Sequence, residues 1–171
     1  MKTRMKDYTI QLATEDKREE ISNFVITMLE ELYPTGAFNP NPTDLVKFNT
    51  IYLNRPIASF YIALNHSRQI VGTAAIRPYD DRFSFLGDLK LVHPVCEMTR
   101  FYVEASYRGI GIGKELYALT ENYAFATGYK TSYLHTSKYL PGGYHFWKSR
   151  GYEENVWEDD QIVHMCKRIY E

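Results

Sequence analysis

A glycine-rich loop between residues 108 and 114 carries the clearest chemistry in this sequence. Its residues are Arg108, Gly109, Ile110, Gly111, Ile112, Gly113 and Lys114. Three glycines therefore stand two apart between two basic side chains. Because glycine has no Cβ atom, successive backbone N–H groups can curl around an anion and a ligand can approach the main chain. The pattern predicts a phosphate-binding loop that suits a pyrophosphate better than a carboxylate; a turn that only joins two elements is the alternative.

The segments on either side of the loop predict a strand and a helix. Residues 95–103 are mostly β-branched, aromatic or sulfur-bearing, as in a half-buried strand. After Lys114, apolar residues recur at helical spacing, namely Leu116, Leu119, Tyr123 and Ala126. The loop therefore leads into a helix N-terminus, where free N–H groups and the helix dipole favour negative charge.

Two common phosphate loops fit this segment poorly. A Walker loop requires Gly-Lys-Ser/Thr, but Gly113-Lys114 is followed by Glu115, and Arg108 stands where the first glycine belongs. A dinucleotide fingerprint requires G-x-G-x-x-G early in a βαβ unit, whereas this loop is G-x-G-x-G and lies past the middle of the chain. The sequence disfavours both.

Three segments together resemble the GNAT-type N-acetyltransferase superfamily. Arg108, Gly111 and Gly113 match that family's Gln/Arg-x-x-Gly-x-Gly/Ala loop. Residues 97–103 resemble its cofactor strand, and residues 146–152 resemble its Phe-Tyr-x-Lys-x-Gly-Phe segment. The resemblance covers about residues 95–155 and is loose before them.

The resemblance implies that acetyl-coenzyme A is the cosubstrate, with no metal. Its pyrophosphate would lie on residues 108–114, and its pantetheine arm would pair with the backbone of Phe101, Tyr102 and Val103. A bulge near Arg100 to Phe101 would expose those backbone groups, and the Val103 amide would stabilise the oxyanion. Glu97 matches the family's general base; a surface or salt-bridged glutamate is the alternative interpretation.

The sequence departs from the family pattern at the position of the proton donor. Trp147 stands where the family has a tyrosine that protonates the leaving thiolate, and Leu140 replaces an asparagine seven residues earlier. Tyr144, one helical turn before Trp147, is the replacement that we expect, with Tyr139 and His145 as rivals. Because a free thiol has a pKa of about 8.5, water could also protonate the thiolate.

The resemblance predicts an N-acetyltransferase that acts by direct attack of a primary amine of a small molecule or peptide. The alternative is a sensor that binds acyl-CoA without turnover, suggested by Trp147 and Leu140. A nucleotide-binding protein comes third. Tyr33, Phe38 and Asn39 are the expected acceptor contacts, because the region that joins the first helices lines the acceptor site in the family. The acceptor, the acyl group and the assembly stay open, and a homodimer is one option.

Composition restricts the class of protein. Of 171 residues, 44% are hydrophobic and 24% charged, which is typical of a globular domain. Twenty basic and 21 acidic residues give a net charge of −1, which argues against nucleic acid as the main partner. No apolar run approaches the length of a membrane span and the N-terminus has no signal-like apolar region. We therefore expect one cytoplasmic domain over residues 1–171, with Cys96 and Cys166 as buried free thiols.

The remaining elements follow from periodicity and turn residues. We expect strands over 8–12, 58–65, 69–77, 131–136, 152–157 and 161–169, and helices over about 15–32, 44–53 and 144–150. Residues 83–91 suggest a short strand or a loop. This order indicates an α/β (α+β) fold. The resemblance makes it a GNAT-like, mostly antiparallel twisted sheet of six to seven strands, with a splayed parallel pair and about four flanking helices.

Overall fold

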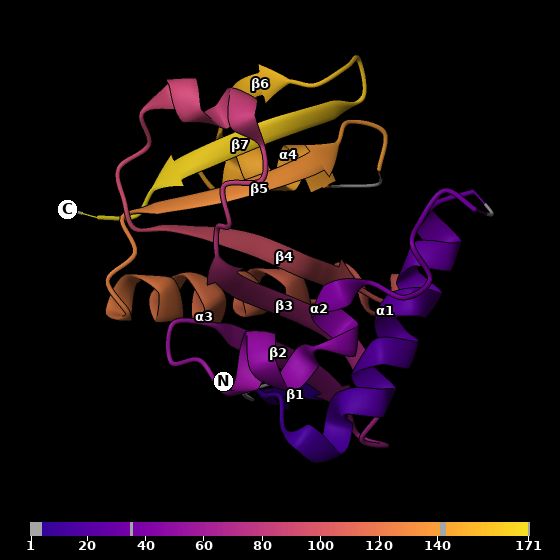
Figure 1. The fold of residues 1–171 in the computed structure, drawn as a ribbon. Helices are drawn as coiled ribbons and strands as arrows, with labels where there is room; N and C mark the ends of the chain where they lie inside the picture. Colours follow the sequence, from indigo (N-terminus) through magenta and orange to yellow (C-terminus); the bar gives the residue numbers. More distant parts are fainter. Residues whose placement is uncertain (1–4, 35, 141–142, 171) are drawn as a thin grey trace. The chain divides into compact units, whose positions relative to one another are not determined.

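The computed structural model describes residues 5–34, 36–140 and 143–170 (Figure 1). Seven strands follow the order β1-β2-β3-β4-β5-β7-β6. They are β1 (Tyr8–Leu12), β2 (Ser59–Asn65), β3 (Ile70–Pro78), β4 (Val95–Val103), β5 (Thr131–Ser137), β6 (Glu153–Trp157) and β7 (Ile162–Arg168). The pair β4–β5 is parallel, whereas β1–β2, β5–β7 and β6–β7 are antiparallel. The predicted mixed α/β sheet with one parallel pair is thus confirmed, while the splay of that pair stays a prediction.

The α-helices are α1 (Arg18–Leu32), α2 (Thr43–Val46), α3 (Ile112–Ala126) and α4 (Gly143–Ser149). Short 3-10 helices occupy η1 (Glu15–Lys17), η3 (Ser84–Leu89) and η4 (Ala105–Tyr107), and η2 (Asn49–Leu53) is a π-helix. In the part of the chain that the structure describes, no helix is both long and apolar enough to cross a membrane. The described residues fall into two compact units, residues 5–75 with 100–120 and residues 76–99 with 121–170, so β3, β4 and α3 contribute to both.

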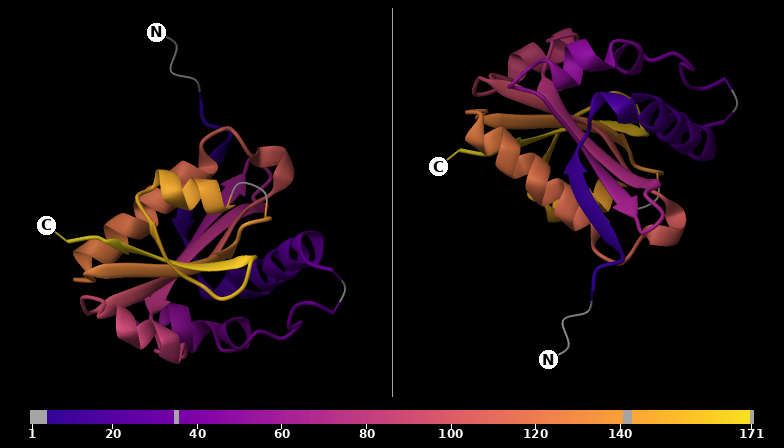
Figure 2. Two further views of the ribbon diagram at one scale, coloured as in Figure 1. Left: turned by 90° about the horizontal axis from the view of Figure 1, so that it is seen from above. Right: turned by 90° about the horizontal axis from the view of Figure 1, so that it is seen from below.

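In the first unit, the strands carry an apolar cluster on each face. Phe60, Ile62 and Leu64 of β2 pack with Ile21 and Val25 of α1. On the opposite face, the cluster contains Tyr8, Ala63, Val71, Ala74, Ile112 and Leu116, so the beginning of α3 covers that side. The alternation of side chains along a strand explains why β2 serves both clusters. Figure 2 shows α1 and α2 on one side of these strands and α3 on the other.

In the second unit, η3 and α4 lie on opposite sides of β5 and β7 (Figure 2, left). Leu86 of η3 is buried in a cluster with Val95, Tyr133 and Cys166. On the other side, Trp147 of α4 meets the Tyr152 ring with centroids 5.4 Å apart, and the Tyr152 hydroxyl is 2.7 Å from the Ser132 hydroxyl. Cys96 and Cys166 are buried free thiols, as predicted.

Two sequence predictions of local structure are wrong. The single helix expected over 44–53 is interrupted, because Lys47 leaves the helical region at φ −101° and ψ 36°. The chain resumes as η2, which buries Tyr52 beside Phe48 and Phe60 with ring centroids 5.0 to 5.4 Å apart. Residues 84–89 form η3 rather than a strand or loop, and Leu86 is its buried residue. In both cases tertiary burial of one or two apolar side chains decides the local conformation.

Gly72 of β3 lies where α3 packs closely on the strands. A Cβ atom there would lie 3.0 Å from Leu116 Cδ1, 3.2 Å from Ile112 Cγ2 and 3.3 Å from the backbone oxygen of Tyr102. We expect Gly72→Ala to lower the free energy of unfolding by about 1–3 kcal/mol in chemical denaturation, because the backbone contact cannot relax easily. Gly87→Ala is the matched control, since a Cβ there meets nothing within 4 Å. Equal effects of the two substitutions would contradict this account of the packing.

The ion pair between Asp44 and Arg100 is buried in the first unit. The Arg100 side chain is 16% exposed and that of Asp44 5%, with Nη2 and Oδ1 2.7 Å apart. We expect Asp44→Ala to cost about 3–5 kcal/mol of unfolding free energy, because it leaves a guanidinium without its buried partner. Glu20→Ala, which removes the more exposed pair with Lys17, should cost less than about 1 kcal/mol. A loss below 1 kcal/mol for Asp44→Ala would show that water replaces the carboxylate.

Candidate active site

The predicted phosphate loop lies between η4 and α3 in the first unit. Gly109 and Gly111 adopt left-handed backbone conformations, with φ of 81° and 101°, and α3 begins at Ile112. Ile112 is fully buried, whereas Arg108, Gly109, Ile110 and Lys114 are exposed. Buried Ile112 thus anchors the loop, whose Gly111 and Gly113 are partly buried and whose other residues are exposed.

The backbone N–H groups of this loop are available to a ligand. Glu115 N donates to the carbonyl oxygen of Gly111 at 3.1 Å and is the first amide of α3 to be bonded in this way. Within the described ranges, the amides from Gly109 to Lys114 have no protein acceptor. The first amides of a helix are unpaired and carry its positive dipole end, so this segment can hold an anion.

The loop is tied to β4 and β1 by side chains. Arg108 Nε donates to the carbonyl oxygen of Val103 at 3.0 Å. A Cβ at Gly113 would lie 3.6 Å from Phe101 Cζ and 3.8 Å from Val103 Cγ2, so the first turn of α3 rests on these two side chains. The Tyr8 hydroxyl donates to Glu115 Oε2 at 2.7 Å, and burial together with this bond raises the pKa of Tyr8 to about 12.

Arg100 interrupts β4 where the sequence predicts a bulge. Its φ of 51° is left-handed, which costs a residue with a side chain about 1–3 kcal/mol. Thr73 Oγ1 donates to its carbonyl oxygen at 2.6 Å, and its guanidinium binds both carboxylate oxygens of Asp44 at 2.7 and 2.9 Å. Tyr52 donates to the same carboxylate at 2.8 Å. These bonds hold the backbone that leads into Phe101, Tyr102 and Val103.

The residues expected to contact the acceptor lie at the end of α1 and beyond it. Tyr33 and Phe38 are partly buried against the cluster of α1 and β2, together with Tyr102. Burial raises the pKa of the Tyr33 hydroxyl, and the Tyr102 hydroxyl adds to the shift. Asn39 is exposed, and its side-chain oxygen accepts a hydrogen bond from the Asn41 amide at 2.9 Å. The structure therefore brings Tyr33 and Phe38 to one apolar cluster and leaves Asn39 in a turn.

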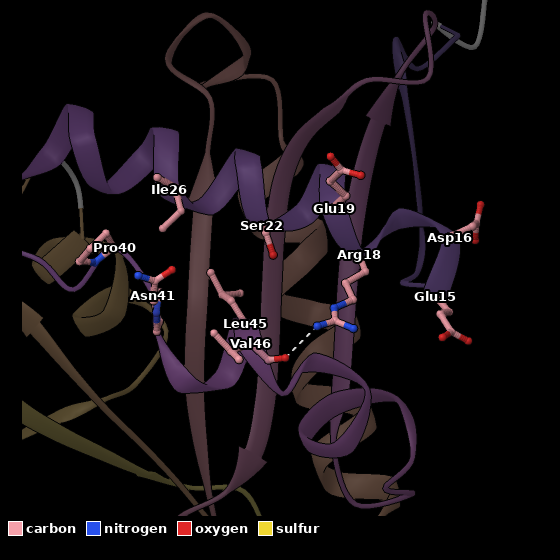
Figure 3. Close-up of a pocket in the computed structure, with 11 residues that line it drawn as sticks. Glu15, Asp16, Arg18, Glu19, Ser22, Ile26, Pro40, Asn41, Leu45 and Val46 are labelled. Carbon is pink, nitrogen blue, oxygen red and sulfur yellow. Dashed lines mark hydrogen bonds between the residues drawn. The ribbon is translucent and has the colours of Figure 1, made fainter.

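Figure 3 shows a cavity of about 600 Å³ beside α1 in the same unit. It lies between α1 and residues 40–46, and Arg18 Nη2 donates across it to the carbonyl oxygen of Val46 at 2.8 Å. Glu15, Asp16 and Glu19 give its rim a negative charge. Its lining contains none of the residues predicted to bind the cofactor or to catalyse transfer, so we assign it no role.

Glu97 lies in the second unit, in a cluster of ion pairs. Its side chain is 2% exposed, and Arg77 Nη2 and Arg82 Nη1 lie 3.1 and 2.9 Å from its Oε1. Arg82 Nη2 also donates to Oε2. Nδ1 of His135 lies 4.0 Å from Oε2. The carboxylate is thus buried and held by two guanidinium groups, and its role as a base stays a prediction.

The aromatic residues of α4 are engaged with the closing hairpin in the second unit. Tyr144 is partly buried, and its hydroxyl donates to Glu154, a carboxylate that also pairs with Lys148 at 3.2 Å. Trp147 is buried, whereas His145 and Tyr139 are exposed and Leu140 is partly buried. The role of Tyr144 as proton donor stays a prediction; in this geometry its proton is already directed to a carboxylate.

Sequence reasoning missed five polar residues of these clusters, namely Asp44, Arg77, Arg82, His135 and His164. Asp44 and Arg100 stand 56 positions apart, and nothing local in the sequence links them. His135 and His164 each lie within a predicted strand, and the available signal was alternation, which puts His135 on the same face as Tyr133. Pairing of β5 with β7 places these two histidines directly opposite each other.

The chain was compared with known proteins by family model, sequence and structure. A model of the acetyltransferase (GNAT) family matches residues 24–152. No protein with a curated description matches the chain in sequence. A GNAT-family acetyltransferase from Staphylococcus aureus Mu50 superposes with a TM-score of 0.77 at 18% identity, covering 95% of this chain and 99% of that one.

Two further solved structures share the fold. An acetyltransferase from Streptococcus agalactiae 2603 has a TM-score of 0.75 at 16% identity, covering 96% of this chain and 99% of its own. The PaiA N-acetyltransferase from Thermoplasma acidophilum, in complex with coenzyme A, has a TM-score of 0.69 at 14% identity, covering 95% and 99%. At such identities the structures show a common fold alone. The family model covers most of this chain, so the chain belongs to the acetyltransferase (GNAT) family.

Proposed function

We propose that this protein transfers an acetyl group from acetyl-CoA to a primary amine of a small molecule or peptide. The observation that carries the proposal is the loop of residues 108–114. Its amides from Gly109 to Lys114 have no protein acceptor in the described part of the chain, and exposed Arg108 and Lys114 flank them. An anion of two adjacent phosphates would find several N–H donors, a helix dipole and two cations there.

The rest of the cofactor would follow β4. Pantetheine carries amide groups, so it can pair with exposed strand backbone in the manner of an added strand. The left-handed Arg100 breaks the regular strand just before Phe101, Tyr102 and Val103, which supports assigning these residues to the pantetheine. In the proposed reaction the Val103 amide donates to the oxyanion, as it would in the family. Arg108 Nε, which now donates to the carbonyl of Val103, would turn to the phosphate.

A sensor that binds acyl-CoA without turnover is the second candidate. Two observations favour it: Glu97 is held by Arg77 and Arg82, and Trp147 is buried where the family has a tyrosine. Thiol release from acetyl-CoA over a panel of polyamines, aminoglycosides, amino acids and peptides separates the two candidates. Release with any of these amines supports the transferase, whereas tight binding with no release from the whole panel supports the sensor.

Calorimetric titration with acetyl-CoA tests the phosphate loop directly. We expect Gly111→Val to weaken acetyl-CoA binding at least tenfold, about 1.4 kcal/mol, because its side chain would occupy the path of the phosphate. Gly128→Val is the matched control, since Gly128 has a similar φ of 93° and a Cβ there meets nothing within 4 Å. Both variants should lose about 1–3 kcal/mol of stability from backbone strain, but only the first should lose affinity.

Two outcomes would refute the proposal. One is that wild-type protein binds no acetyl-CoA at millimolar concentration. The other is an equal change in affinity for both glycine variants, which would make Gly111 a structural residue.

We further expect Arg108→Ala to weaken acetyl-CoA binding about 10-fold in the same titration, because a charge-assisted hydrogen bond contributes about 1.5–3 kcal/mol.

A further inference from the structure

A second cavity, of about 570 Å³, lies at one end of the strands in the second unit. Residues 89–92, after η3, form part of its lining, together with Glu153 and Asn155 of β6 and the end of β7. In Figure 1 the segment that joins η3 to β4 passes beside the C-terminal end of β7. Every lining residue belongs to the second unit, so the cavity is defined within that unit alone. Its volume is in the range of small-molecule sites, about 300–1,000 Å³.

The segment of residues 90–92 is held in place from two sides. Lys90 has a left-handed backbone with φ of 48°. Leu91 packs against the buried cluster that η3 covers. Thr131 Oγ1 donates to the carbonyl oxygen of Val92 at 2.7 Å. The protein itself therefore fixes this part of the lining.

The backbone N–H groups of the same segment are available to a ligand. Among the described residues, the amides of Lys90, Leu91 and Val92 donate to no backbone or side-chain acceptor. Successive amides beside a left-handed residue form the kind of concave donor array that binds anions. Because these residues line the cavity, their amides can serve an anion that binds there.

Cationic side chains outnumber carboxylates in the lining. Lys90 and Arg168 are exposed, and neither forms an ion pair within the described part of the chain. Lys167 also lines the cavity, but its ammonium already pairs with Glu121 at 2.9 Å. Glu153 is the carboxylate of the lining, and it pairs with no cation of the described ranges. Two unpaired cations against one carboxylate leave the cavity positive, which favours an anion.

β6 adds a further hydrogen-bond donor. The register between β6 and β7 shifts between Glu154 and Val156, so Asn155 has no partner residue in β7. Its side-chain amide likewise has no hydrogen-bond partner in the residues that the structure describes. A bulge commonly redirects a side chain away from the regular ladder. Asn155 can therefore donate to a ligand in the cavity.

The remaining part of the lining supplies uncharged, apolar surface. Val92 is 38% exposed, and Leu89 is partly buried. Burial raises the pKa of the Cys166 thiol to about 12, so this group is neutral at neutral pH. An organic group attached to the bound anion would find apolar contacts on this surface.

We propose that this cavity binds a small organic molecule through a phosphate monoester, with the phosphate on Lys90, Arg168 and the amides of residues 90–92. A phosphate monoester carries a charge of about −1.5 to −2 at pH 7 and three acceptor oxygens, whereas a carboxylate carries one charge and two oxygens. Two unpaired cations and several unpaired N–H groups match the phosphate better. The proposal concerns the second unit alone and does not depend on acetyl transfer.

Amide NMR of the full chain, with phenyl phosphate as the probe, tests this site. We expect saturable shifts at residues 90–92 and at Arg168, with a Kd of about 1 mM or tighter. Benzoate keeps the ring but should bind at least about threefold more weakly, because it offers fewer oxygens and less charge. Inorganic phosphate should also bind more weakly, because it makes no apolar contact with Val92.

Charge substitutions should change the affinity for phenyl phosphate in opposite directions. We expect Lys90→Gln and Arg168→Gln each to weaken binding about 10-fold, because each removes a charge-assisted hydrogen bond. Glu153→Gln should strengthen binding about threefold, because it removes a like charge near the phosphate. Lys47→Gln is the matched control, since this exposed lysine of the first unit does not line the cavity and its loss should change nothing.

Shifts confined to residues 109–114, or no shifts at millimolar phenyl phosphate, would overturn the proposal. Unchanged affinity in both the Lys90 and the Arg168 variant would overturn it as well. Equal affinity for benzoate would refute the phosphate, and equal affinity for inorganic phosphate would refute the organic group. The spectrum of each variant reports whether it is folded, and unfolding cannot produce the gain expected for Glu153→Gln. Each of these outcomes can be read whether or not the chain binds acetyl-CoA.

Discussion

The buried bond between Asp44 and Arg100 is the interaction on which the backbone of β4 depends. A left-handed residue inside a strand is unfavourable by itself, and β4 contains one in the middle of its run. Asp44, Tyr52 and Thr73 stabilise it from three different elements. Before this point β4 is fully buried from Val95 to Met98, and after it Phe101, Tyr102 and Val103 are only half-buried. A strand that changes its exposure in this way can serve the core with one part and a ligand with the other.

Glycine has two distinct uses in the first unit. At Gly72 the missing Cβ lets α3 approach β3, because Leu116 and Ile112 occupy that space. At Gly111 the missing Cβ leaves open space and a left-handed backbone, with the Tyr8 hydroxyl at 3.7 Å as the nearest neighbour. The first glycine serves the stability of the fold. The second would serve the ligand, because its amide and those beside it are free to bind a phosphate.

Burial changes what an acidic residue can do. Glu97 stands at the family's position for a base, yet its carboxylate lies between two guanidinium groups and is shielded from water. A carboxylate in such a site is valuable as a fixed negative charge, since it orients the groups around it. Nearby His135 has the opposite character: it is neutral, partly exposed and oriented by acceptors on one side.

The sequence by itself determined the order of the strands along the chain and the family, and it predicted the phosphate loop. Alternation and turn residues located every strand to within a few residues, and Arg108, Gly111 and Gly113 at their spacing pointed to a pyrophosphate, because these signals are local and depend on backbone geometry. Only the tertiary structure decided that Asp44 holds Arg100, that Arg77 and Arg82 enclose Glu97, and that His135 lies opposite His164. These contacts join residues 15 to 56 positions apart, and pairing at such separations follows from strand order and burial rather than from local pattern. The same reason explains the misjudged segments 44–53 and 83–91, where burial of Tyr52 and Leu86 overrode local propensity.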